Sequence, residues 1–154
     1  MSVQNPHDRF FRQSFSRPQI IEQFIVEYLP PAIVSRLRLD TLTLESDSFV
    51  DEEFQEHQAD MLYSVLTTMG DKIYLYLLLE HKSYRDPVIA WQLLRYIVQI
   101  WEQDSKEKRP LRLVLPIVIY HGEDKWTVET DFQSFLGDVP DDWRPYVPIQ
   151  LSIV

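Results

Sequence analysis

Two apolar runs on either side of a short loop are the feature that most restricts how this chain can fold. The runs cover residues 58–67 and 72–79, and Gly70 lies in the segment between them. Runs of this length, joined by a short connection that contains glycine, are typical of a β-hairpin. The sequence therefore predicts a hairpin near the middle of the chain.

Both faces of this hairpin are apolar. Alternate residues of a strand point to opposite sides of the sheet. One side carries Leu62 and Leu66, and the other carries Met61, Tyr63 and Val65. Strands that are apolar on both faces lie between two covering layers. The pattern predicts an α/β fold, namely an α/β/α sandwich around a central mixed sheet.

The positions of prolines and capping residues, together with the spacing of apolar residues, predict the covering helices and the further strands. Pro18 suits the first turn of a helix capped by Ser16, and Asp86-Pro87 is a similar start for a longer helix. Pro116 places the last strand at a sheet edge or a bulge. Expected helices cover residues 18–29, 32–37, 86–104 and 131–136, and expected strands cover 41–44, 48–50, 58–67, 72–79 and 111–120.

The hairpin brings two carboxylates into one place. If Met69, Gly70 and Asp71 form the loop, then Asp60 lies directly opposite Glu80. Directly opposed residues have Cβ atoms about 4.5–5.5 Å apart. Lys82, two residues beyond Glu80, points to the same face. A two-residue loop would shift the register by one residue and move Asp60 and Glu80 to opposite faces.

Two carboxylates this close repel each other unless a cation lies between them. Mg²⁺ suits such a site because it prefers oxygen ligands and keeps several waters, and Mn²⁺ or Ca²⁺ can substitute. A bound cation of this kind activates a phosphodiester and a water molecule for hydrolysis. We therefore assign Asp60, Glu80 and Lys82 as the candidate catalytic residues and Asp60 and Glu80 as the metal ligands, with phosphodiester hydrolysis as the chemistry.

A simpler interpretation exists for each of these residues. A Glu-x-Lys pair is common, and an aspartate at the start of a strand is usually a solvated end. The setting favours the metal site, because Glu80 closes a strand that is otherwise apolar from Ile73 to Leu79. Charged residues in such a position are seldom buried without a partner.

Several stretches of the sequence, in order and over nearly the whole chain, resemble one bacterial family. They include Ala59-Asp60-Met61-Leu62-Tyr63, Leu78-Leu79-Glu80-His81-Lys82 and Pro116-Ile117-Val118-Ile119-Tyr120-His121-Gly122, with shorter matches at 7–12, 44–51 and 94–96. The resemblance is to the Rpn family of recombination-promoting nucleases, which belongs to the PD-(D/E)xK superfamily.

This resemblance implies a restriction-endonuclease-like fold and Mg²⁺-dependent DNA endonuclease activity linked to recombination. Asp60 matches the aspartate of the superfamily motif, and Glu80 and Lys82 match its (D/E)xK element. Family members usually extend further at the C-terminus. We therefore expect residues 1–154 to be a nuclease domain that forms the N-terminal part of a longer protein.

Two residues of the long helix are candidate supporting residues. Gln92 and Tyr96 resemble the Gln-xxx-Tyr element of RecB-like nucleases, which helps to orient the site and contacts DNA. Gln99 and Gln103 continue the same stripe. The alternative is that all four form the solvated face of an amphipathic helix, and we favour that alternative for Gln99 and Gln103.

Composition adds constraints on location and partners. The chain has no cysteine, which excludes disulfides and cysteine-ligated zinc and fits a cytoplasmic protein. Neither a secretion signal nor an apolar run long enough for a membrane span is visible. The formal net charge of −9 is unusual for a protein that binds DNA. A non-catalytic DNA-binding or protein-interaction module is therefore the second hypothesis, and assembly into a homo-oligomer stays open.

Overall fold

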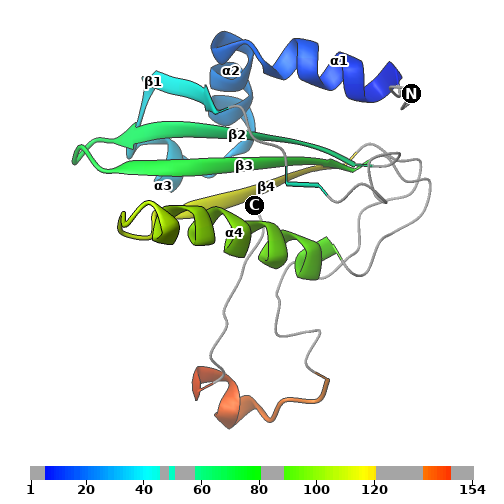
Figure 1. Ribbon diagram of the computed structural model, residues 1–154, viewed down its shortest axis with the longest axis vertical. Helices are drawn as coiled ribbons and strands as arrows, with labels where there is room; N and C mark the ends of the chain where they lie inside the picture. The colour runs from blue at the N-terminus through cyan, green and yellow to red at the C-terminus, as the bar shows by residue number, and fades with distance from the viewer. Residues whose placement is uncertain (1–5, 46–48, 51–57, 81–88, 121–136, 147–154) are drawn as a thin grey trace.

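The structure is a computed structural model that describes residues 6–45, 49–50, 58–80, 89–120 and 137–146 (Figure 1). Four helices, four strands and one 3₁₀ helix are described within these ranges. In chain order they are α1 (Pro6–Phe15), α2 (Pro18–Tyr28), α3 (Pro31–Val34), β1 (Leu37–Glu45), β2 (Gln58–Thr67), β3 (Lys72–Glu80), α4 (Ile89–Lys106), β4 (Val114–Tyr120) and the 3₁₀ helix η3 (Asp141–Tyr146).

The four strands form one mixed sheet in the order β1-β2-β3-β4. β1 pairs antiparallel with β2, and β2 pairs antiparallel with β3, whereas β4 runs parallel to β3. A parallel neighbour needs a crossover connection, and α4 lies in it. β4 carries Pro116 at the edge of the sheet, as predicted from the missing N–H donor of proline.

Helices cover both faces of the sheet, with α1 and α2 on one side and α4 on the other (Figure 1). Odd-numbered residues of β2 and β3, such as Tyr63 and Leu75, pack in the core beneath α1 and α2. Even-numbered residues, such as Tyr76 and Leu78, pack against α4. The predicted α/β/α sandwich with a mixed sheet is therefore confirmed, and it is consistent with a restriction-endonuclease-like fold. None of the described helices has the length and apolar character of a membrane span.

The hairpin turn differs from the prediction by one residue. Leu66 pairs with Lys72, and the backbone N–H of Thr67 donates to the carbonyl of Asp71 at 2.8 Å. The loop is thus Thr68-Met69-Gly70, with Gly70 at a φ of 90°. Glycine adopts this left-handed region without the steric penalty of a Cβ atom. Its place in the turn sets the register of both strands.

Several local predictions need correction. Ser16 does not cap α2, because its hydroxyl donates to the carbonyl of Gln13 at 3.1 Å and the N-cap position is Arg17. Residues 49–50 form an extended connection without strand pairing. The helices α1 and η3 were not predicted. Asp86-Pro87 and residues 131–136 lie outside the described residues.

The helix α1 packs on the sheet through aromatic residues, although most of its sequence is polar. Phe11 is buried, and its ring lies 5.0 Å from that of Phe15. The hydroxyl of Tyr63 on β2 donates to the backbone carbonyl of Phe15. Burial raises the pKa of Tyr63 to about 12, so this donor keeps its proton throughout the physiological range.

A buried carboxylate at the end of α4 fixes the chain that leads to β4. Asp104 is 1% exposed, and its Oδ1 accepts hydrogen bonds from Arg109 at 3.0 Å and Arg112 at 3.1 Å. Arg112 also lies over the ring of Tyr74 at 4.4 Å from the centroid. Asp104 therefore connects α4, β3 and the start of β4, and holds the helix against the sheet.

We predict that Asp104→Asn lowers the free energy of unfolding by about 3 kcal/mol, because it leaves the charge of Arg112 buried without its partner. Urea denaturation followed by circular dichroism measures this change. The matched control is Asp40→Asn, which removes a carboxylate with 76% side-chain exposure from its 3.8 Å pair with Arg38. The control should change stability by about 0.5 kcal/mol or less. Equal losses in the two variants would contradict the assigned role of Asp104.

Candidate functional site

Asp60 and Glu80 lie on the same face of adjacent strands, and both are almost completely buried, at 1% and 0% exposure. Asp60 pairs with Leu78, and Glu80 pairs with Gln58. The prediction that the two carboxylates are directly opposed is therefore wrong by two residues of register, because the loop begins one residue earlier. A shift of two residues keeps both side chains on one face, where diagonal neighbours remain within reach of each other.

Among the described residues, Phe49 and Tyr76 donate hydrogen bonds to the carboxylate of Asp60. Its Oδ2 accepts a hydrogen bond from the backbone N–H of Phe49 at 2.6 Å and from the hydroxyl of Tyr76 at 2.7 Å. The ring of Phe49 meets that of Tyr76 edge-on, with centroids 6.1 Å apart. Phe49 is thus placed directly beside the site, and it holds Asp60 together with Tyr76.

Glu80 belongs to a buried polar chain with two glutamines. The Nε2 of Gln58 donates to Oε2 of Glu80 at 2.7 Å and to Oε1 of Gln92 at 2.6 Å. Both acceptors require the nitrogen of Gln58 at this position, because an amide oxygen cannot donate. Gln92 comes from α4, so this chain joins β2, β3 and the covering helix.

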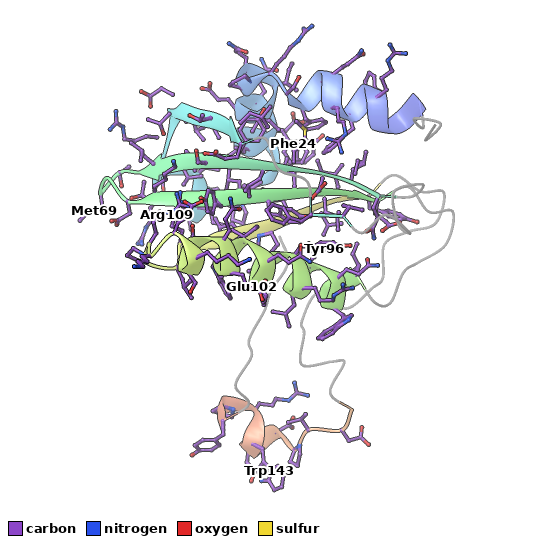
Figure 2. The ribbon with its side chains drawn as sticks, viewed as in Figure 1. Phe24, Met69, Tyr96, Glu102, Arg109 and Trp143 are labelled. Carbon is purple, nitrogen blue, oxygen red and sulfur yellow. The ribbon has the colours of Figure 1, made fainter. Side chains whose placement is uncertain are left out.

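The helix α4 separates the predicted supporting residues into two groups. Gln92 and Tyr96 are buried, at 1% and 0% exposure, whereas Gln103 is exposed and Gln99 is half-buried. The ring of Tyr96 lies 6.1 Å from that of Tyr76, in the layer between α4 and the sheet (Figure 2). Gln92 reaches Glu80 through the amide of Gln58, and the solvated-face interpretation is wrong for Gln92 and Tyr96 because both are buried.

Lys82 lies outside the described residues, so its position relative to Glu80 stays a prediction. Glu22 and Glu27 on α2, which could in principle have reached the site, are exposed. Within the described part of the chain, the site thus comprises Asp60 and Glu80 with Gln58, Tyr76, Gln92, Tyr96 and the backbone of Phe49.

The ligand atoms suit a hard cation. They are carboxylate and amide oxygens, which Mg²⁺ and Ca²⁺ prefer. The described residues contain no group of three or more histidine, cysteine, aspartate or glutamate side chains arranged for a metal. Two carboxylates are nevertheless sufficient for Mg²⁺, which keeps several waters and shares its remaining positions with phosphate oxygens. Burying two carboxylates in one place is costly without compensation, and a divalent cation would supply that compensation.

Three contributors to this site escaped the sequence analysis. Gln58 precedes Asp60 by two residues and shares its face, which parity alone could have revealed. Tyr76 also has the parity of Glu80, but its hydroxyl contact depends on the register of the hairpin. The backbone N–H of Phe49 had no sequence signal, because only the path of the chain after β1 brings it to Asp60.

The sequence matches a known protein family over nearly its whole length. Residues 5–150 match the family model described as "Putative transposase, YhgA-like". The chain is 37% identical over 123 residues to recombination-promoting nuclease RpnD of Escherichia coli O157:H7, and 34% identical over 118 residues to RpnA of Escherichia coli K12. These alignments cover 79% and 76% of this chain. No solved structure matches the chain.

Some similar proteins are named as inactive. The chain is 33% identical over 124 residues, or 79% of its length, to the inactive recombination-promoting nuclease-like protein RpnE of Escherichia coli K12. The chain spans less than half of each of these relatives, at 47% of RpnD, 40% of RpnA and 41% of RpnE. Similarity therefore extends to proteins that are named as nucleases and to at least one that is named as inactive.

We predict that Tyr76→Phe lowers the free energy of unfolding by about 2 kcal/mol, because it removes a buried hydrogen bond to a carboxylate. Thermal and urea unfolding measure the loss. Tyr28→Phe on the exposed side of α2 is the matched control and should leave stability nearly unchanged. If Tyr76→Phe is as stable as Tyr28→Phe, the hydroxyl does not hold Asp60.

Proposed function

Because the chain belongs to the YhgA-like transposase family, which includes proteins named as recombination-promoting nucleases, we propose that it is a metal-dependent DNA endonuclease. Asp60 and Glu80 bind the cation, which is Mg²⁺, and Mn²⁺ or Ca²⁺ can occupy the same position. The substrate is the phosphodiester backbone of DNA, and the activity is linked to recombination.

One observation carries the proposal. Two carboxylates lie on one face of the β2–β3 hairpin with almost no exposure to solvent, held by neutral donors and covered by α4. Such burial opposes folding unless a cation or another charge compensates for it. Buried ionisable groups of this kind are typical of catalytic or binding sites, where their chemistry is needed despite their cost to stability.

The residues of the chain have distinct tasks in this scheme. Tyr76 and the backbone of Phe49 hold Asp60, and Gln58 holds Glu80. Both carboxylates therefore keep fixed orientations toward the cation and the substrate. Tyr96 and Gln92 form the wall of α4 that limits access of water. Lys82, two residues after Glu80, would stabilise negative charge on the phosphate in the transition state. When bound, the cation supplies Lewis acidity toward a phosphate oxygen.

The net charge of −9 requires that DNA approach one local surface, because the chain as a whole repels a polyanion. A cation at Asp60 and Glu80 lowers this repulsion at the site itself. We therefore expect DNA binding to depend on the cation and to weaken with added monovalent salt.

A second function is favoured by the similarity to RpnE, which is named as inactive. In this case the domain binds DNA or a protein partner without cleaving it. This chain has Asp60, Glu80 and Lys82 in the motif positions, which supports the catalytic proposal. The two functions differ in whether a phosphodiester bond is broken.

Incubation with supercoiled plasmid tests the proposal. We expect nicked and linear products with Mg²⁺, none with EDTA, and a loss of rate of about a hundredfold or more in Asp60→Asn and Glu80→Gln, since cation stabilisation of the transition state is worth several kcal/mol. Asp40→Asn, an exposed aspartate on β1, is the matched control and should cleave normally. Undiminished cleavage by Asp60→Asn would refute the assigned site, and plasmid binding without cleavage would favour the second function.

A further inference from the structure

Gln58 occupies the centre of the buried polar chain, and its amide nitrogen holds Glu80, whereas its amide oxygen has no role in the proposed cation site. It is 3% exposed and lies two residues before Asp60 on the same strand and the same face. In the register of the hairpin it is the direct partner of Glu80. Its side chain is therefore on the same face of the sheet as both carboxylates, directly across from Glu80.

The two N–H groups of Gln58 are both used. One donates to Oε2 of Glu80 and the other to Oε1 of Gln92, at 2.7 and 2.6 Å. Reversal of the amide would place its oxygen against a carboxylate oxygen and another amide oxygen, so the orientation is determined by chemistry. The nitrogen is thus fixed, and the oxygen must point elsewhere.

The Oε1 atom of Gln58 is buried and, among the residues that the structure describes, has no hydrogen-bond partner. Buried polar atoms nearly always have a partner in folded proteins. An amide oxygen accepts hydrogen bonds or coordinates a hard cation, and it has no other polar role. A buried acceptor on the face that carries two carboxylates is suited to a cation, or to a water molecule bound to one.

We propose that Gln58 completes the cation site in two ways: its amide nitrogen positions Glu80, and its amide oxygen is a ligand of the cation. Its Nε2 holds the carboxylate of Glu80 in place, and its Oε1 faces the cation directly or through one water. The cation then has three oxygen-bearing side chains from a single hairpin, namely Asp60, Glu80 and Gln58. This inference rests on the proposed function, because it needs the cation.

A purely structural role for Gln58 makes a different prediction. A buried glutamine that only joins β2, β3 and α4 would contribute to stability, and its loss would lower the melting temperature. The affinity for a cation would not change, provided that the protein still folds. Metal affinity therefore separates the two roles, whereas stability alone does not.

The test is calorimetric titration of the 154-residue chain with Mn²⁺. Gln58→Met keeps the length of the side chain and removes both polar atoms. We expect it to weaken Mn²⁺ binding by about tenfold to a hundredfold, the usual effect of removing a residue that orients a metal ligand. Gln103→Met, the same substitution at an exposed position of α4, is the matched control and should bind Mn²⁺ like the wild type.

A second variant tests the oxygen separately from the nitrogen. Gln58→Glu retains an oxygen at the same position but has no N–H to hold Glu80. We expect it to bind Mn²⁺ more tightly than Gln58→Met, and to gain more from Mn²⁺ in melting temperature than the wild type gains, because three carboxylates repel one another without the cation. If Gln58→Met does not fold, Gln58→Asn, which is too short to span Glu80 and Gln92, replaces it with the same expected loss.

The outcomes are distinguishable. Wild-type affinity in Gln58→Met would overturn the inference and leave the proposed function intact. Equal weakness of Gln58→Glu and Gln58→Met would overturn the role of the oxygen. Absence of Mn²⁺ binding in the wild type would overturn the proposed function and this inference with it.

Discussion

The pairing of β2 with β3 is the interaction on which the rest of the structure depends. It places Asp60 and Glu80 on the face of the sheet on which α4 packs, while α1 and α2 pack on the opposite face. Slippage by one residue would put the carboxylates on opposite sides and expose half of each core. The turn at Gly70, with a φ of 90°, therefore determines both the packing of the sheet and the composition of the site.

The site is built at the end of β3 that is distant from this turn, where polar groups from three elements meet under α4. Each carboxylate has a neutral donor, Tyr76 for Asp60 and Gln58 for Glu80. At the other end of the helix, Asp104 and its arginine partners hold α4 against the start of β4. This arrangement fixes the helix at one end by a buried ion pair, so that Gln92 and Tyr96 at the other end keep a defined position over the carboxylates.

Much of this fold could be predicted from the sequence, for physical reasons that individual residues illustrate. The apolar faces of the hairpin required layers on both sides, and Pro116 required an edge. The three-residue loop length was sufficient to place Asp60 and Glu80 on one face, even though the loop was assigned one residue too late. The amphipathic period of α4 could not distinguish Gln92 from Gln103, because both are polar and only the tertiary contact with Gln58 buries one of them. The helix α1 was missed because most of its residues are polar and its few phenylalanines do not show a clear helical period. The contact of Phe49 with Asp60 depends on the path of the chain.

The central claim is that the buried carboxylates of the hairpin form a divalent-cation site. Crystals of the chain grown with Mn²⁺, measured near the manganese absorption edge, test it most directly through the anomalous difference map. The account predicts a peak about 2.1–2.6 Å from oxygens of both Asp60 and Glu80, as expected for oxygen ligands of a hard cation. A map without a peak at these two residues, from crystals in which Mn²⁺ is well above the concentration of the protein, would contradict it.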